Sequence, residues 1–390
     1  MRDRLARTPL IRFATSLKIP VICLGLLIVI VFWGTLYQKD FGLYEAQQRF
    51  FYSWVILIFG VIPFPGSRLV LWCFFVALSL TMIFKLQYTR RTIGIVIVHF
   101  GVLTFFVTAF VSFHFSQHSS LLLAEGMSST VSSDYNDWEL SAWTVGESDA
   151  THTERDVLAV DGDKLAGGGS FQLPEFGLTV DVLEYFEHCR PLASGSNPHK
   201  AQNKGGIASL QALPRQTNPQ ENLPGGYFRV TGTDGHQHTY LLHAADLRPA
   251  MMVHREDPVH LALRRKRYAL PFPVRLIDFE RRVHPGTQVP SSFSSRVEVG
   301  EGAASRSVLI YMNEPLRHKA FTFFQASFTP DEKGSVFAVV ENPGRILPYV
   351  ASTVTIAGLM VHFLMMLWPA IRRSGARAPA GHAVSRKAAS

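Results

Sequence analysis

Four long apolar segments, with one polar stretch of domain size before the last of them, constrain the fold of this 390-residue chain more than any other feature. A helix needs about 20 predominantly apolar residues to cross the hydrocarbon core of a bilayer. Three such segments lie in the first third of the chain, and the fourth lies near its end. They are residues 19–36, 69–86, 93–115 and 347–369. The sequence therefore predicts a polytopic membrane protein with four transmembrane helices.

The first apolar segment follows several basic residues and could be mistaken for a secretory signal. Its exit reads FWGTLYQKD, with bulky residues where a cleavage site needs small ones. We therefore expect this segment to be a retained membrane anchor.

Lys and Arg beside the apolar segments predict the orientation of the chain. They are in excess in the tail 1–18, in the link 87–92 and in the tail 370–390, and such segments face the cytoplasm. The loop 37–68 and the large segment 116–346 then lie on the opposite side. We expect a multi-pass protein of the inner (cytoplasmic) membrane, with both termini in the cytoplasm and the large domain in the periplasm or outer side. The net charge of +8 is then an orientation signal, and no nucleic-acid partner is expected.

The loop 37–68 is too apolar for a plain connection. Aromatic and apolar residues recur in it at helical spacing, and two prolines follow them. The residues are Tyr44, Gln48, Phe51, Val55 and Phe59, followed by Pro63 and Pro65. This pattern predicts an amphipathic helix at the membrane interface that ends before the prolines.

Segment 116–346 alternates short apolar–polar runs with turn residues, as in FGLTVDVLEYF and AFTFFQASF. Alternation with a period of two indicates strands, so we expect a large, mainly antiparallel β domain between the third and fourth helices. Residues 190–226 are rich in Pro, Gly, Asn and Gln and predict a mobile loop. The run Arg264–Arg267 is interpreted as a solvated turn or strand edge, although an acidic partner or an anionic cofactor could also bind it.

Motifs of common enzyme chemistry are missing from the sequence. The three cysteines form no C-x-x-C pair, and we expect Cys189 to be a structural thiol. The histidines of the β domain show no zinc-binding spacing, and no P-loop or G-x-S-x-G motif occurs in a supporting context. No catalytic residue is assigned, and whether the chain is an enzyme stays open.

Two histidines lie inside apolar segments, where ionisable groups are uncommon and often functional. His99 lies about 9 Å from the cytoplasmic start of the third segment, and His362 lies about 10 Å from the same face in the fourth. Matching depth on two helices suits axial ligands of a haem iron, although each ring could instead bond to a neighbouring backbone. His114 lies about 22 Å further out than His99 and is a weaker candidate for cofactor binding.

Several segments resemble proteins of the ResB/CcsB type, which act in cytochrome c biogenesis. SLKIPVICLGLLIVIVFWGTLYQ is similar to the first span of that family, and GIVIVHFGVLTFF is similar to its third span. IYMNEPLRHKAFTFFQASF carries the most specific resemblance. Its matching residues are Met312, Asn313, Pro315, Leu316, Phe324, Gln325 and Ser327.

The resemblance implies a subunit of the System II cytochrome c synthase. Such a subunit works with a CcsA-type partner to deliver haem b across the membrane and to attach it to apocytochrome c at C-x-x-C-H, with cysteines kept reduced by a thiol-reducing system. The family's third-span histidine is a haem ligand, and His99 occupies that position, with the second ligand expected on the partner. The chain alone is then not expected to be catalytic.

Two other functions fit parts of the sequence. A cytochrome b-like electron-transfer subunit would use His99 and His362 as ligands, but it leaves the β domain unexplained. A cofactor-free membrane assembly or sensor protein would use the helices only as anchors.

Overall fold

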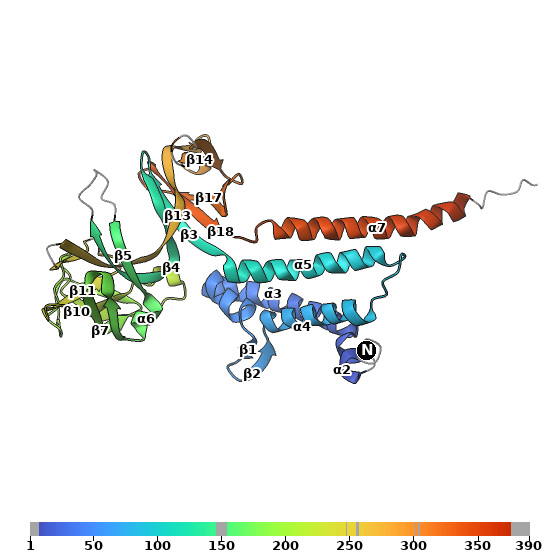
Figure 1. Cartoon of the computed structure of the whole chain (residues 1–390), viewed down its shortest axis with the longest axis horizontal. Coiled ribbons are helices and arrows are strands. Elements are labelled where there is room, and N and C mark those ends of the chain that lie inside the picture. The colour runs from blue at the N-terminus through green and yellow to red at the C-terminus, as the bar shows by residue number, and fades with distance from the viewer. Residues whose placement is uncertain are drawn as a thin grey trace, which may run out of the picture. The chain divides into compact units, whose positions relative to one another are not determined.

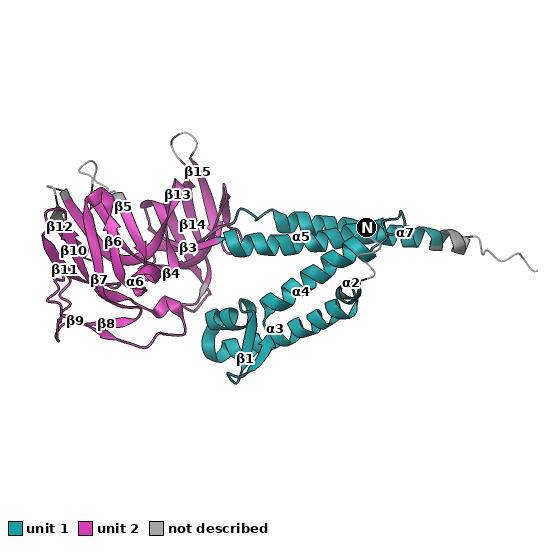
Figure 2. Cartoon of the chain, turned by 60° about the horizontal axis from the view of Figure 1, so that its bottom comes forward, with its two compact units in different colours: residues 1–116, 342–390 teal, residues 117–341 magenta. Residues whose placement is uncertain are grey.

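The computed structural model describes residues 8–145, 154–246, 248–254, 257–300, 302 and 305–375. The chain divides into two compact units, Met1–Ser116 with Asn342–Ser390, and Gln117–Glu341 (Figure 2). The first unit is helical and the second is built of strands (Figure 1). The outer parts of the two predicted cytoplasmic tails, residues 1–7 and 376–390, lie outside the described residues.

All four predicted apolar segments form helices. They are α3 (Lys18–Ala46), α4 (Ser67–Leu80), α5 (Ile93–Phe115) and α7 (Leu347–Gly375), and a short helix α2 (Pro9–Ala14) precedes them. Each of the four is long and apolar enough, with its continuation, to cross a bilayer. α3 continues well beyond the predicted end at residue 36, and Gly42 interrupts it with a φ of 80°. α4 continues as a π-helical turn, Thr81–Lys85.

The connection from α3 to α4 is only partly helical, in contrast to the predicted amphipathic helix. A π-helical turn (Gln47–Phe51) ends the helix, and strands β1 (Val55–Ile58) and β2 (Ile62–Pro65) form a hairpin. Val55 and Phe59 therefore lie in the hairpin and its turn, not on a helix. β-Branched residues and proline favour an edge strand over a helix here, and the turn has positive φ at Phe59 and Gly60.

α5 and α7 pack antiparallel at very short distance because glycines line their contact. A Cβ atom on Gly94 would lie 2.6 Å from the backbone nitrogen of His362, and one on Gly101 would lie 2.2 Å from Thr355 Oγ1. On the other helix, a Cβ on Gly358 would lie 2.7 Å from the backbone nitrogen of Val98. Small residues allow such close backbone approach between helices in a membrane.

The second unit contains a ten-stranded sheet, in which the strands pair antiparallel. Its main path runs β15–β14–β13–β4–β3–β18–β17–β16, with β12 on β13 and β5 on β4. The strands are β3 (Gln117–Ala124), β4 (Ser128–Val145), β5 (Glu154–Asp161), β12 (Ala250–His254), β13 (Asp257–Val283), β14 (Pro290–Val299), β15 (Arg306–Tyr311), β16 (Leu316–His318), β17 (Phe321–Phe328) and β18 (Gly334–Glu341). The predicted large antiparallel β domain is therefore present.

A four-stranded antiparallel sheet packs on one half of the large sheet. Its order is β11 (Gln237–His243), β10 (Gly225–Gly232), β7 (Leu178–Phe186) and β6 (Gly169–Leu173), and a short helix α6 (Gly162–Ala166) precedes β6. Leu178, Phe228 and Leu261 are buried in the core between the two sheets. A second core lies under the other half of the large sheet and includes Val274, Phe323 and Phe337.

The segment predicted as a mobile loop, residues 190–226, contains regular structure. β8 (Cys189–Leu192) pairs antiparallel with β9 (Ser209–Ala212). Asn197 both donates to the carbonyl of Ala201 (2.8 Å) and accepts from its N–H (2.9 Å). The asparagines that gave the segment its loop-like composition therefore fix its backbone.

Candidate functional site

His99 is the predicted site residue with the most specific geometry. Its Nδ1 lies 2.8 Å from the carbonyl oxygen of Ile95, one turn earlier on α5, and the side chain is half-buried. Because a carbonyl only accepts, Nδ1 carries the proton of the neutral ring and donates it. Nε2 then holds the lone pair, and it makes no hydrogen bond to any described residue. A histidine fixed in this way is suited to bind a metal through Nε2.

His99 lies on the side of α5 opposite to α7. The residues that approach α7 are Gly94 and Gly101, and at 3.6 residues per turn His99 is rotated about 140° from the first and about 160° from the second. Phe106 and Phe110 lie within about 20° of His99 on the helix surface. His99 is therefore one end of an aromatic line along α5.

Helix α4 contacts the same line. The ring of Phe106 packs on Phe74 and Phe75, with centroid distances of 5.5 and 5.6 Å. The side of α5 that carries His99 therefore faces α4 in the C-terminal half of α5. Helix α7 packs on the opposite side of α5.

His362 does not lie opposite His99. His362 contacts α5 at Gly94. Gly94 precedes His99 by five residues, which is about 7.5 Å along the helix axis. His99 and His362 are therefore not level in the helix pair, because α7 passes the level of Ile93 before it reaches Pro369, so the two residues from which the depths were counted do not lie at one level. His362 lies on the face of α7 that packs on α5, so the two histidines point to different surroundings.

His114 repeats the arrangement of His99 near the end of α5. Its Nδ1 lies 3.0 Å from the carbonyl oxygen of Phe110, again four residues earlier, and the side chain is exposed. Nothing in the described structure joins it to His99, which is about 22 Å away along the helix.

The motif residues Met312 to Ser327 divide into an exposed and a buried set. Met312 and Phe324 are 47% and 42% exposed, whereas Leu316 is buried. Asn313 adopts a φ of 70° in the turn after β15, a conformation that asparagine tolerates better than most residues. Only the exposed set is available to a partner.

Gln325 has a structural role that its place in the motif does not reveal. Its Oε1 accepts from Ser295 Oγ (2.7 Å), and its Nε2 donates to Ser335 Oγ (2.6 Å) and to the carbonyl of Ser327 (3.2 Å). Both serines are fully buried, on β14 and β18. The side chain therefore ties β17 to two other strands of the sheet.

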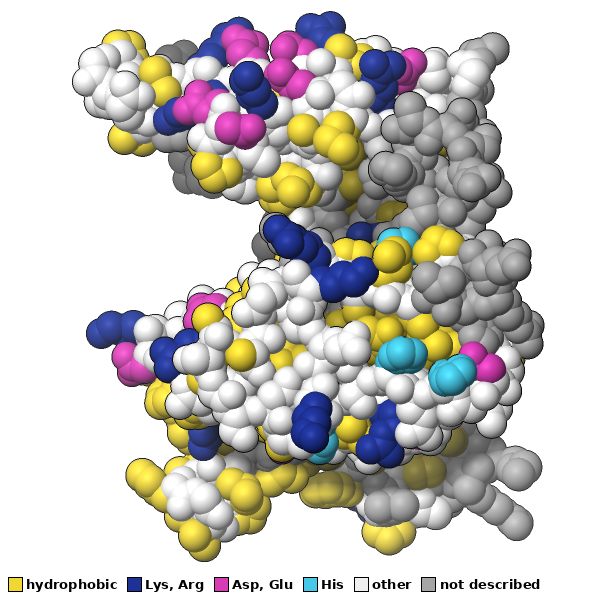
Figure 3. Space-filling view, turned by 90° about the vertical axis from the view of Figure 1, so that its left-hand side faces the viewer, with side chains coloured by type: hydrophobic (Ala, Val, Ile, Leu, Met, Phe, Trp, Pro, Cys, Tyr) yellow, Lys and Arg dark blue, Asp and Glu magenta, His cyan; other side chains and the backbone are white. Residues whose placement is uncertain are grey.

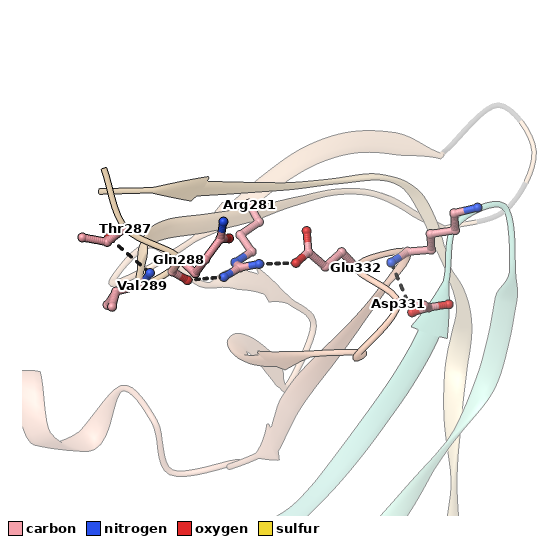
Figure 4. A network of polar contacts seen from close by, with 7 residues as sticks. Arg281, Thr287, Gln288, Val289, Asp331 and Glu332 are labelled. Atoms are coloured by element: carbon pink, nitrogen blue, oxygen red, sulfur yellow. Dashed lines mark hydrogen bonds and ion pairs between the residues drawn. The ribbon is translucent and has the colours of Figure 1, made fainter. Parts of the chain in front are cut away.

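A second polar network secures the loops beside this motif (Figure 4). Arg281 on β13 donates to Glu332 in the turn before β18 and to the carbonyl of Gln288 (2.5 Å). The N–H of Val289 donates to Thr287 Oγ1 at 3.2 Å. One arginine therefore connects the β13–β14 loop with the β17–β18 turn.

The basic run Arg264–Arg267 lies within β13, and its side chains have partners inside the unit. These are Glu139 for Arg264 (3.0 Å), the ring of Trp138 for Arg265 (4.0 Å to the centroid) and Asp161 for Lys266 (2.7 Å). Basic and acidic side chains are also interspersed over the face shown in Figure 3. The run lies within a strand paired with β4 and not in a turn, and Arg264, Arg265 and Lys266 are partly buried, so the interpretation as a solvated turn or strand edge is wrong for these side chains.

Cys189 on β8 and His243 on β11 form a buried pair between two different sheets. Burial raises the pKa of the Cys189 thiol to about 12, so the thiol is protonated and unreactive at neutral pH. Burial lowers the pKa of His243, whose Nε2 donates to the carbonyl of Cys189 (3.2 Å) and whose Nδ1 accepts from the N–H of Ala245 (3.1 Å). Cys189 and His243 therefore have a structural role in the β unit.

Comparison with known proteins gives two matches. The ResB-like family model matches residues 248–346, from β12 to the residue before α7. Protein NrfI of Wolinella succinogenes is 31% identical over 108 residues, which is 27% of this chain and 12% of NrfI. His99 lies outside the residues that the family model matches.

Proposed function

We propose that this chain, whose residues 248–346 match the ResB-like family model and which is similar to NrfI over 108 residues, is a ResB/CcsB-type subunit of a membrane system that delivers haem to exported cytochromes c. The family match and the similarity to NrfI support a role in cytochrome c biogenesis. Covalent attachment at C-x-x-C-H would be shared with a CcsA-type partner. In this proposal the four helices lie in the inner membrane and the β unit faces the apocytochrome.

The geometry of His99 is the observation that carries the proposal. The bond from Nδ1 to the Ile95 carbonyl fixes the ring and leaves Nε2 as a lone-pair donor in apolar surroundings. Haem b is the substrate in transit, and Nε2 of His99 would be one axial ligand. The second ligand would come from the partner, since His362 lies at the contact between α5 and α7, whereas His99 lies on the opposite side of α5.

In the proposal, His362 and His114 are not ligands of the haem that His99 binds. Each can contact haem on its own, but neither shares an iron with His99, because one differs in helix face and the other lies about 22 Å away. The alternative of a cytochrome b-like subunit that uses His99 and His362 would, with this geometry, place the two histidines at different irons, and it still leaves the β domain unexplained.

In this proposal the described residues of the β unit supply binding surface, and none of them is assigned as a reacting group. Met312 and Phe324 are exposed, large and apolar, and they fit contact with the apocytochrome or with the partner subunit. The thiols of the apocytochrome would be kept reduced by a separate thiol-reducing system, because Cys189 is buried and protonated.

The test uses the chain co-expressed with its CcsA-type partner and a C-x-x-C-H reporter. We expect His99→Gly to lose most of the haem absorption of the purified complex and most reporter maturation, and added imidazole to restore part of both. His362→Gly is the matched control and keeps the haem bound at His99. The proposal is wrong if His99→Gly retains full haem content and full maturation. Absence of haem from the wild-type complex would favour the cofactor-free alternative.

A further inference from the structure

A cavity of about 470 Å³ lies between the first turns of α4 and the last turns of α5. Its walls are mainly aromatic, and the aromatic line that starts at His99 runs into it. The wall residues include Leu71, Trp72, Phe75, Phe106, Phe110 and Phe113. This size is within the usual range of small-molecule sites, which are mostly apolar with a few polar groups.

Arg68 supplies a positive charge to this cavity. Its guanidinium lies over the rings of Trp54 (4.9 Å) and Phe113 (5.9 Å), and no carboxylate of a described residue pairs with it. The first turn of α4 contains no acidic residue, and the positive end of the helix dipole adds to the charge of Arg68. An unpaired cation in an apolar wall favours an anionic ligand.

Ser67 and His114 are two further polar groups that line the cavity. Ser67 is 2% exposed, and its hydroxyl has no hydrogen-bond partner among the described residues. His114 has its Nδ1 held by the Phe110 carbonyl, and its ring lies against Phe110 (4.3 Å) and Phe113 (4.9 Å). Its Nε2 therefore offers a lone pair at the cavity wall.

We propose that this cavity is a second docking site for haem, at which Arg68 binds the propionate carboxylates and His114 meets the iron. The aromatic walls suit a flat, apolar macrocycle, Arg68 suits its carboxylates, and a lone-pair nitrogen suits its metal. A phospholipid shares the anionic head and the apolar body, but it has no metal ion for the Nε2 lone pair to bind. The inference rests on the proposed function in taking haem as the substrate.

With this site, the aromatic line of α5 has a histidine near each of its two ends. His99 and His114 are 15 residues apart, about 22 Å along the helix, with Phe106 and Phe110 between them. Two fixed imidazoles on one side of one helix would hold haem at successive depths.

The test measures porphyrin binding by the full chain carrying His99→Gly, in phosphatidylcholine nanodiscs without the partner. Metal-free protoporphyrin, its dimethyl ester and haem are the three probes. We expect Arg68→Gln to weaken protoporphyrin binding about tenfold, as for a lost charge-assisted hydrogen bond, and to leave the dimethyl ester unaffected. His114→Gln should weaken haem binding and leave protoporphyrin binding unchanged.

Control variants distinguish specific porphyrin binding in the cavity from a general effect of removing a positive charge. Arg68→Lys should retain most of the affinity, and Arg91→Gln, an exposed cation in the α4–α5 link, should change nothing. The proposal is overturned if the wild-type chain binds ester and acid equally, if Arg68→Gln binds normally, or if His114→Gln leaves haem binding unchanged. Loss of porphyrin binding on adding phosphatidylglycerol would make the cavity a lipid site.

Failure here and failure of the proposed function are distinguishable. Porphyrin binding is read without the partner and without a reporter, whereas the role of His99 is read from haem content and maturation in the complex. Normal results for one experiment and negative results for the other therefore overturn only the corresponding proposal.

Discussion

Gly94 of α5 lies directly against the backbone of His362 of α7. A Cβ atom at position 94 would lie 2.6, 2.7 and 2.8 Å from the nitrogen, Cα and Cβ of His362. Real Cβ contacts are longer, so the two helices can keep this distance only with glycine at that position. The contact fixes which side of α5 is left for His99.

Gly94→Ala and Gly101→Ala should each destabilise the α5–α7 pair. A methyl group must push the helices apart, and such overpacking costs about 1–3 kcal/mol. Resistance of the purified protein to unfolding by dodecyl sulfate measures the effect. Gly25→Ala is the control, because nothing lies within 4 Å of a Cβ at that position of α3. Equal stability of all three variants would contradict the close packing.

Gln325→Ala should destabilise the β unit more than Phe324→Ala, although both residues belong to the same motif. Loss of Gln325 removes its hydrogen bonds with Ser295, Ser335 and the Ser327 carbonyl, each of which contributes about 0.5–1.5 kcal/mol, while Ser295 and Ser335 keep their bond to each other (2.9 Å). Phe324 is 42% exposed, so its truncation removes less buried surface. Thermal unfolding of the two variants compares their losses of stability. A larger loss for Phe324→Ala than for Gln325→Ala would contradict the structural role of Gln325.

Arg264→Met and Lys266→Met separate a buried from an exposed ion pair on one strand. The side chains of Arg264 and Glu139 are 13% and 6% exposed, and removing one partner of a buried pair costs about 3–5 kcal/mol. Lys266 and Asp161 are 31% and 43% exposed, so that pair contributes about 0–1 kcal/mol. Chemical denaturation of both variants gives the comparison. Similar losses would mean that the location of the pair does not decide its contribution.

His243 should make the stability of the β unit depend on pH below neutrality. Burial lowers its pKa in the folded state, so the unfolded chain binds the proton more readily. The stabilisation is complete above the unfolded pKa of about 6.5 and is lost as pH falls from there through the folded pKa. Melting temperatures between about pH 5.5 and 7.5 should fall more in the wild type than in His243→Gln. Exposed His236 gives the control variant, His236→Gln, which should follow the wild type.

The apolar helices and the antiparallel strands could be predicted because their signals are local. Segment 93–115 is apolar throughout, and α5 begins and ends at those residues. The strand pattern of FGLTVDVLEYF likewise gave β7. Both rest on periodicity within one element, which the sequence shows directly.

Contacts between different helices and strands could not be predicted from the sequence. Depth counting compared His99 with His362 from Ile93 and Pro369, and these two reference residues do not lie at the same level in the helix pair. The α3–α4 connection has helical spacing up to Phe59, but its pairing with Ile62–Pro65 prevails. Ser67 and Arg68 gave no signal of a cavity, since its walls come from two helices and a turn.

Strand β13 contributes side chains to both cores of the β unit, and its register against β4 shifts between Arg265 and Arg267 and again between Ala269 and Val274. Val259, Leu261 and Leu263 belong to the first core, and Val274 and Leu276 belong to the second. A single backbone of 27 residues therefore sets the alignment of both halves. The two cores are consequently joined by continuous strand backbone and not by a loop, so separating the two halves of the β unit would require β13 to leave one of its cores.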